Sequence, residues 1–200
     1  MIDIISDTIG NAWKELVFKT LKKGNKLADE GLEILDVRII FKADTLMYDQ
    51  VLNTYADKEM ILNMKKVFFT EEENSLGHSY FNKICSPFNN DYRLDIVKVL
   101  SEKKESKRAT LTLNSSGNGK VPCINVINFL IRDNKLYVYY FSRGQDAYKK
   151  FYADAIVISI MQSEIAKELS VDIGIITGYI TSAHIYNSDM NNINKFLFNK

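Results

Sequence analysis

The stretch VPCINVINFLIRDNKLYVYYFSRGQD, residues 121–146, decides the fold of this 200-residue chain. Two runs rich in β-branched and aromatic residues, 123–131 and 136–141, flank a short polar turn of Asp, Asn and Lys. This arrangement is typical of a β-hairpin. The hairpin would place Cys123 at the start of one strand and Arg143 just after the end of the next, so we expect the two side chains to lie close together.

The rest of the chain predicts helices and strands around this hairpin. The longest helical pattern runs from Ala155 to Leu169, and its nearly all-round apolar character indicates a helix buried between layers. We therefore expect an α+β fold with one long buried helix. Apolar spacing predicts further helices over residues 11–23, 44–69 and 94–103. Alternation predicts strands over residues 32–41, with Leu35, Val37, Ile39 and Phe41 on one side, and over residues 109–113 and 173–180.

Composition and charge limit the classes of function. With 46% hydrophobic residues and no Pro-rich or Gly-rich linker, residues 1–200 are expected to form a single domain. The 26 basic and 25 acidic residues nearly cancel, so no overall field favours nucleic acid or a membrane. Without a signal peptide or an apolar span, we expect a cytoplasmic protein. Neither Cys85 nor Cys123 has zinc-ligand spacing, so no metal site is expected.

Four short motifs follow one another along the second half of the chain. They are VPC at 121–123, SRGQD at 142–146, DAI at 154–156 and AHIY at 183–186. In order and spacing they resemble the thymidylate synthase superfamily, which includes the pyrimidine nucleotide hydroxymethylases. The resemblance is strong over the last third and weak before Leu76. It implies a thymidylate synthase-like mixed β-sheet packed against helices, a homodimer, and a pyrimidine nucleoside monophosphate as substrate.

The resemblance also implies roles for residues of the last third. Cys123 would be the nucleophile that attacks C6 of the pyrimidine ring, as a thiolate that needs a cationic neighbour. Arg143 would hold the nucleotide phosphate with its fork of donors. His184 and Tyr186 alternate with an isoleucine on a strand, so both leave the same face. In the resembled family this pair contacts the sugar hydroxyl.

Four further assignments rest on the resemblance. Lys107 and Arg108 would reach across the dimer interface to the same phosphate, with Lys107 standing where the family usually has Arg. Glu59 would be the catalytic acid or base, because an acid inside an apolar helical run is costly unless it is used. Asp146 would contact the pterin of 5,10-methylenetetrahydrofolate, which supplies the carbon that cysteine attack alone does not provide.

Asp154 is the residue that indicates which pyrimidine base the substrate carries. Thymidylate synthases typically have Asn at this position, whereas the cytidylate hydroxymethylases have Asp. Uracil presents an N3–H donor and an O4 acceptor, which an amide matches, while cytosine presents an N4 amino donor and an N3 acceptor, which a carboxyl group matches. Asp154 therefore indicates a cytosine nucleotide. Ser182, where thymidylate synthases usually have Asp, is a second departure from the uracil enzymes.

Each of these residues also has a structural explanation. Cys123 alone would more often be a small core residue. The charges around Lys107 would more often be a solvated run. Glu59 would be an exposed helix position, and Asp154 would cap the helix that begins at Ala155.

Three departures from the family bear on activity. The early arginine loop has no clear counterpart in residues 24–31, where Lys26 is the available cation. Trp13 is the only tryptophan, so the family's later tryptophans are absent. The chain ends fourteen residues after Tyr186, so we expect it to lack the C-terminal segment that closes over folate.

The sequence thus predicts a C5 one-carbon transferase that hydroxymethylates CMP or dCMP through attack of Cys123 at C6. Two alternatives stay open at this point. One is a non-catalytic nucleotide-binding relative, and the other is an enzyme that uses the same cysteine adduct without folate.

Overall fold

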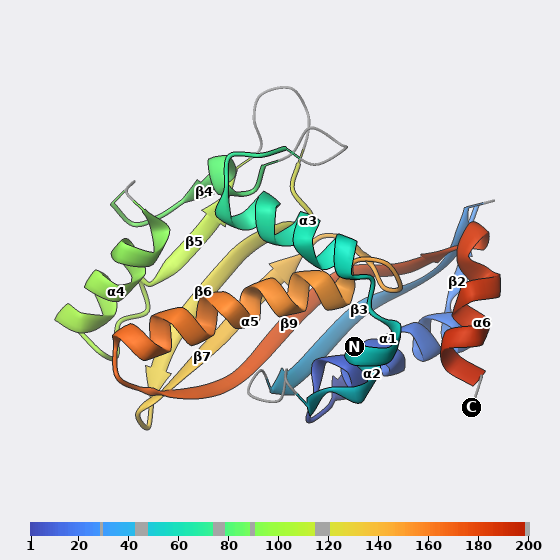
Figure 1. The fold of residues 1–200 in the computed structure, drawn as a ribbon, viewed down its shortest axis with the longest axis horizontal. Helices are drawn as coiled ribbons and strands as arrows, with labels where there is room; N and C mark the ends of the chain where they lie inside the picture. Colours follow the sequence, from blue (N-terminus) through green and yellow to red (C-terminus); the bar gives the residue numbers. More distant parts are fainter. Residues whose placement is uncertain (29, 43–47, 74–78, 89–90, 115–120, 199–200) are drawn as a thin grey trace.

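The computed structural model describes residues 1–28, 30–42, 48–73, 79–88, 91–114 and 121–198, which form a nine-stranded mixed sheet with helices on one face (Figure 1). The strand order is β1-β3-β9-β7-β6-β5-β4, with β2 beside β3 and β8 beside β9. The strands are β1 Ile2–Ile5, β2 Asn25–Leu27, β3 Gly31–Lys42, β4 Ile84–Cys85, β5 Thr110–Leu113, β6 Ile124–Arg132, β7 Lys135–Ser142, β8 Gln145–Asp146 and β9 Asp172–Tyr186. The α-helices are α1 Ile9–Lys23, α2 Gln50–Tyr55, α3 Lys58–Phe69, α4 Tyr92–Glu102, α5 Phe151–Glu168 and α6 Met190–Phe198.

The expected hairpin is formed by β6 and β7, which pair antiparallel. Asp133 and Asn134 have φ angles of 49° and 57°, the left-handed conformation that a two-residue hairpin turn requires. At the other end of the hairpin, the Arg143 N–H donates to the Cys123 carbonyl at 2.9 Å. The prediction that Cys123 and Arg143 lie at neighbouring strand ends is confirmed.

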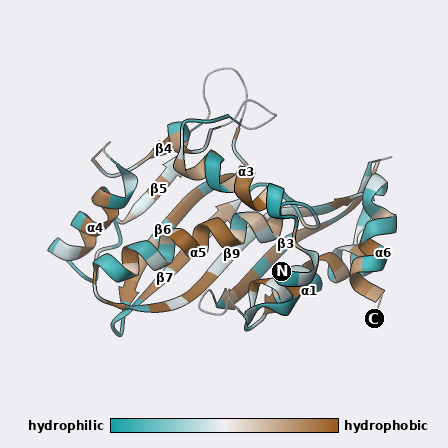
Figure 2. Ribbon diagram, in the orientation of Figure 1, coloured by the Kyte–Doolittle hydropathy of each residue, from teal (hydrophilic) through white to brown (hydrophobic). Residues whose placement is uncertain are grey.

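Helix α5 is the long buried helix, and its central turns are hydrophobic (Figure 2). It lies over β7 and β9 (Figure 1). The helix begins at Phe151, four residues before the predicted start, with Lys150 at the N-cap position. Asp154 therefore lies in the first turn and is not the N-cap, which corrects one structural explanation given above. The Asp154 carboxyl group does not cap the helix and is therefore available for a different contact.

The two longest strands, β3 and β9, pair antiparallel through the middle of the sheet, and β9 continues as one strand through His184 and Tyr186. The predicted alternation in β3 is correct for Val37 and the residues after it but wrong for Leu35, which is exposed. Asp36 has a φ of 58°, and this left-handed residue shifts the side-chain alternation between Ile34 and Val37, both of which are buried.

The predicted helix over residues 44–69 is divided. Its first residues lie outside the described part, and the remainder forms α2 and α3. The Asp57 carboxylate accepts hydrogen bonds from the Glu59 and Met60 N–H groups, so Asp57 is the N-cap that starts α3. Glu59 consequently lies in the first turn and is exposed.

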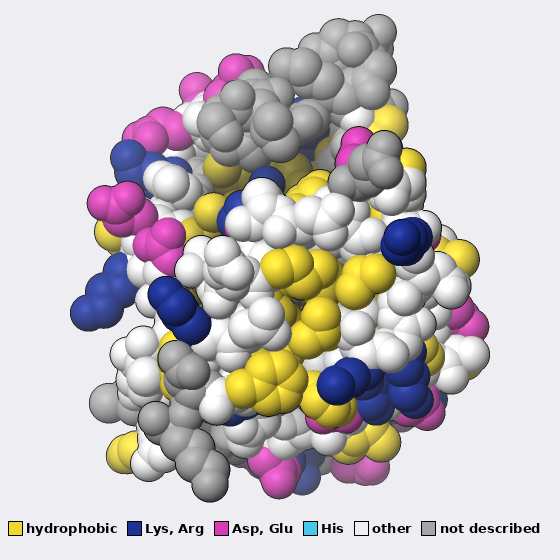
Figure 3. Space-filling model, turned by 90° about the vertical axis from the view of Figure 1, so that its right-hand side faces the viewer, with side chains coloured by type: hydrophobic (Ala, Val, Ile, Leu, Met, Phe, Trp, Pro, Cys, Tyr) yellow, Lys and Arg dark blue, Asp and Glu magenta, His cyan; other side chains and the backbone are white. Residues whose placement is uncertain are grey.

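Trp13 of α1 anchors the segment between β8 and α5. Its indole N–H donates to the Tyr148 carbonyl at 2.9 Å, and its ring packs against Tyr152 and Phe196, with centroid distances of 4.3 and 4.2 Å. Figure 3 views the end of the molecule that carries α6 and shows hydrophobic side chains gathered on that surface. The Trp13 cluster thus ties α1, α6 and the start of α5 into one packed unit.

The sequence Gly117-Asn118-Gly119 is typical of a turn, but these residues, like residues 74–78, lie outside the described ranges. Among the described residues, no helix is long and apolar enough to cross a membrane. A cytoplasmic location and the lack of nucleic-acid binding stay predictions.

Candidate functional site

A cleft of about 360 Å³ opens where β6 begins, β7 and β9 end, and α5 starts. Six of the nine predicted site residues line it, from four separate segments of the chain. Its lining residues are Met64, Tyr80, Cys123, Arg143, Gly144, Gln145, Asp146, Lys150, Asp154, His184 and Tyr186. Its volume lies within the range of small-molecule sites.

Cys123 is partly buried in this cleft, and its backbone N–H donates to the Tyr80 hydroxyl oxygen at 3.2 Å. Burial raises the pKa of the Cys123 thiol, and the nearby Asp154 carboxyl raises it further. The cations of Arg143 and Lys150 act in the opposite direction without outweighing the burial. Without a ligand, the thiol is therefore held largely in its protonated form at neutral pH.

Arg143 projects from the end of β7 at the edge of the cleft. Its Nε donates to the Pro122 carbonyl at 3.0 Å and its Nη2 to the Val121 carbonyl at 2.8 Å. These bonds fix the guanidinium beside Cys123. Since an arginine carries five N–H groups, this arrangement leaves donors for an anion.

Asp154 and Gln145 form a buried pair on the floor of the cleft. Asp154 is 6% and Gln145 2% exposed, and the Gln145 Nε2 donates to the Asp154 Oδ2 at 2.9 Å. Burial raises the pKa of Asp154 to about 6, although the Gln145 hydrogen bond and Lys150 act to lower it. The carboxyl group therefore titrates close to neutral pH.

His184, Tyr186 and Asp146 form another wall. The His184 and Tyr186 rings meet edge to face with centroids 5.2 Å apart, which confirms that both leave the same side of β9. Asp146 of β8 pairs with His184 in the sheet, and its Oδ1 accepts hydrogen bonds from the Tyr148 and Lys149 N–H groups. Burial raises the pKa of Asp146.

Three predicted site residues are not brought to this cleft. Glu59 is exposed at the start of α3, because the Asp57 cap places it in a solvent-facing first turn. Lys107 and Arg108 are exposed before β5 and do not line the cleft of their own chain. A role for this pair in phosphate binding therefore requires a second protomer.

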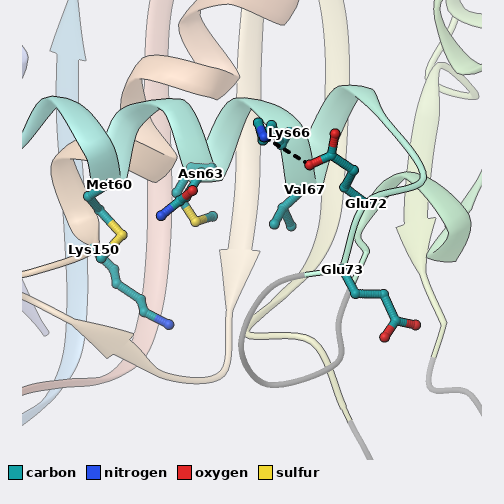
Figure 4. A pocket seen from close by; sticks show the side chains of 8 residues that line it. Met60, Asn63, Lys66, Val67, Glu72, Glu73 and Lys150 are labelled. Carbon is teal, nitrogen blue, oxygen red and sulfur yellow. Dashed lines mark ion pairs between the residues drawn. The ribbon is translucent and has the colours of Figure 1, made fainter.

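A neighbouring cavity of about 220 Å³ lies under α3 and shares Met64 and Lys150 with the cleft. Met60, Met64 and Val67 give it an apolar wall, and Lys150 extends beneath the helix (Figure 4). At its far end Lys66 forms an ion pair with Glu72 at 3.0 Å (Figure 4). The cavity therefore has one apolar wall and an otherwise polar lining, which includes Asn63, Glu73 and Lys150, and it adjoins the cleft.

Sequence reasoning assigned no role to three polar side chains of the cleft, those of Tyr80, Gln145 and Lys150. Gln145 stands inside the SRGQD motif, so its position between Arg143 and Asp146 was an available signal. Tyr80 and Lys150 carried none, because only the tertiary structure brings them to Cys123. The described residues contain no cluster of three or more His, Cys, Asp or Glu suited to hold a metal ion.

Comparisons with known proteins agree with this geometry. The family model described as thymidylate synthase matches residues 11–200. A protein of Methanocaldococcus jannaschii named "Putative thymidylate synthase" is 26% identical over 213 residues, which cover 98% of this chain and 96% of the relative. Proteins with the same name from Methanothermobacter thermautotrophicus and Methanosarcina mazei are 24% and 23% identical, covering 89% and 93% of this chain and 90% of each relative. The chain belongs to the thymidylate synthase family.

Proposed function

We propose that this protein transfers a one-carbon unit to C5 of a cytosine nucleoside monophosphate, CMP or dCMP, in a hydroxymethylation reaction. The observation that carries the proposal is the buried Asp154 carboxyl group, which lines the same cleft as Cys123. A carboxyl group there accepts a hydrogen bond from the cytosine N4 amino group. When ionised it also repels the O4 oxygen of uracil, which is itself an acceptor.

The remaining cleft residues suit the rest of a nucleotide. The Arg143 guanidinium at the edge offers bidentate donors to the phosphate. His184 and Tyr186 would contact the sugar. With the base seated against Asp154, the Cys123 sulfur would add to ring C6, and the electron pair of the C5–C6 double bond would make C5 nucleophilic.

The pKa of Cys123 bears on this step. Burial keeps the free thiol protonated, so addition needs the cations of Arg143 and Lys150 to stabilise the thiolate. The thiol proton would leave to solvent as the bond to C6 forms. After C5 is substituted, loss of the C5 proton and expulsion of the Cys123 sulfur would restore the C5–C6 double bond. Glu59 is too exposed at the start of α3 to be included in this proposal.

The carbon donor that the family implies is 5,10-methylenetetrahydrofolate, and the residues present fit such a group. The Asp146 carboxyl group would accept hydrogen bonds from the N–H groups of the pterin. The wall formed by Met60, Met64 and Val67 would pack against the apolar part of the cofactor. Bound there, the cofactor would supply the one-carbon unit at the formaldehyde oxidation level.

Replacing Asp154 by Asn tests the base assignment. We expect the wild-type protein to bind CMP or dCMP more tightly than UMP or dUMP, and the variant to shift toward uracil by about 10- to 100-fold, because an amide matches the uracil edge. Calorimetric titration of all four nucleotides into both proteins measures this shift. Equal preference in the two proteins would contradict the assignment, and the absence of monophosphate binding in the wild type would contradict the proposed function.

We also propose that the protein acts as a homodimer formed through the open face of its sheet. The helices cover the opposite face (Figure 1). On the open face Phe141 and Tyr179 are adjacent across β7 and β9 and are 45% and 41% exposed, and Leu35 is exposed on β3. Such an apolar surface is typical of a subunit contact, and two-fold symmetry would bury it on both protomers.

Phe141→Arg should convert this dimer to a monomer, since it would place two unpaired charges in the contact. Sedimentation velocity would measure the change. Leu62→Arg is a matched control, because Leu62 is 57% exposed on α3 and lies away from the sheet. If the partner's Lys107 and Arg108 complete the phosphate site, the Phe141 variant should also bind CMP more weakly. A wild-type protein that sediments as a monomer would contradict the proposal.

A further inference from the structure

Gln145 presents an unused acceptor at the floor of the cleft. Among the residues that the structure describes, its Oε1 and the Asp154 Oδ1 are buried side-chain oxygens without a hydrogen-bond partner. Both residues line the cleft, and both are more than nine-tenths buried. Because a buried polar atom without a partner costs free energy, this pair is built to receive donors from a ligand.

We propose that Gln145 positions Asp154 and is a second determinant of base specificity, accepting one N–H of the cytosine amino group at its Oε1 while Asp154 Oδ1 accepts the other. The inference rests on the proposed function, since it assumes that a pyrimidine nucleotide occupies the cleft. Gln145 fixes the orientation of the carboxyl group because its Nε2 already donates to Oδ2 at 2.9 Å. Only Oδ1 is then left to face the base.

The chemistry of the two bases explains why a pair of acceptors selects cytosine. The cytosine N4 amino group carries two N–H donors, one for each oxygen. Uracil has a single N3–H donor on this edge, and its O4 would face an acceptor. With a uracil nucleotide, at most one of the two oxygens, Gln145 Oε1 and Asp154 Oδ1, can accept a hydrogen bond from the base. The other oxygen would stay unpaired and would face uracil O4, which is itself an acceptor.

The selection should depend on pH, because a protonated Asp154 becomes a donor. A protonated Asp154 can donate to uracil O4 or to cytosine N3, while the Gln145 oxygen accepts an N–H from either base. The protonated site therefore matches both bases. Since the pKa of Asp154 is about 6, discrimination is weak below that pH and grows as the pH rises through it. The ionisable groups that act on this carboxyl or respond to it are Cys123, Tyr80, Tyr140, Lys150 and Asp146.

Gln145→Met tests the inference, since it keeps the length of the side chain and removes both polar atoms. Losing the hydrogen bond that lowers the pKa of Asp154 should move the titration of that carboxyl to higher pH. The preference for CMP over UMP at about pH 7.5 should fall by up to about tenfold, the scale of one buried hydrogen bond to the neutral Gln145 amide oxygen. Gln162→Met is the matched control, because Gln162 is also buried with an unpartnered Oε1 but lies outside the cleft.

Two readouts separate the possible results. Carbon-13 NMR of the Asp carboxyl groups, recorded without ligand between about pH 5 and 8, follows Asp154 itself, and calorimetry with CMP and UMP follows specificity. An unchanged Asp154 midpoint, or an unchanged preference, in a folded Gln145→Met protein overturns the inference while the proposed function stands. A wild-type protein that binds neither nucleotide overturns the proposed function instead.

If Gln145→Met does not fold, Gln145→Glu serves in its place. This nearly isosteric change keeps the acceptor oxygen, replaces the amide NH2 group by a second oxygen, and so removes the N–H that orients Asp154. Two adjacent carboxyl groups compete for one proton, so the higher of the two midpoints of the pair should lie above the wild-type Asp154 midpoint. If neither midpoint of the pair lies above the wild-type value, the inference is overturned.

Discussion

Replacing Cys123 by Ser should lower exchange of the C5 hydrogen of CMP or dCMP by about 10³-fold or more, the scale of loss when a covalent nucleophile is removed. Exchange requires sulfur addition at C6, because only then is C5 basic enough to pick up a proton. A hydroxyl group at this position is a much weaker nucleophile than a thiolate. Release of tritium from the C5-labelled nucleotide measures the rate directly.

The control for this prediction is Cys85→Ser. Cys85 lies on β4, does not line the cleft, and accepts a hydrogen bond from Asn114 Nδ2 at 3.1 Å. Its replacement should leave exchange unchanged. Nucleotide affinity should also survive in Cys123→Ser, since Asp154 and Arg143 remain in place. A Cys123→Ser protein that still exchanges the C5 hydrogen at the wild-type rate would rule out the proposed mechanism.

The same assay separates the alternatives left open by the sequence. Exchange or turnover that depends strictly on methylenetetrahydrofolate would exclude a folate-independent enzyme. Exchange without folate would favour use of the cysteine adduct alone. Tight binding of CMP with no exchange under either condition would identify a non-catalytic nucleotide-binding member of the family.

Trp13→Ala should lower the free energy of unfolding by about 3–5 kcal/mol, the usual range for truncating a large aromatic side chain in a core. The Trp13 side chain is 1% exposed, and its removal leaves a cavity between Tyr152 and Phe196. It also removes the indole N–H that the Tyr148 carbonyl accepts. Urea denaturation followed by circular dichroism measures the change.

Phe18→Ala is the control for this stability prediction. Phe18 lies on the same helix as Trp13 and is 38% exposed, so its truncation should cost about 1 kcal/mol or less. If Trp13→Ala also lowered the free energy of unfolding by only about 1 kcal/mol, the aromatic cluster around Trp13 would not be a main source of stability. Because Trp13 holds the segment between β8 and α5, we also expect Trp13→Ala to weaken nucleotide binding.

Much of the fold could be predicted because it follows from local patterns. The β6–β7 hairpin needs only two β-rich runs and a turn. The apolar run that forms α5 is hydrophobic on nearly all sides, so it has to be buried between layers of the fold. The same regularity put Cys123, Arg143, His184 and Tyr186 at strand ends. The motif spacing then indicated the family and a cytosine base through Asp154.

Errors arose where a local feature interrupted a pattern. A left-handed Asp36 shifted the alternation in β3 and exposed Leu35. Asp57 started a new helix and turned Glu59 to solvent. A single capping bond or one unusual φ angle changes the direction of every following side chain, and neither leaves a clear trace in hydrophobic periodicity.

The sequence by itself determined the fold class, the hairpin, the buried helix and most of the residues that line the cleft, because these depend on periodicity and on short motifs. Only the tertiary structure decided that Tyr80 lies against Cys123, that Lys150 joins two cavities, and that Gln145 orients Asp154. It also decided the protonation of the site, since the pKa of Asp154 depends on burial by segments far apart in the chain. Desolvation is a property of the packed environment, and no single stretch of sequence contains it.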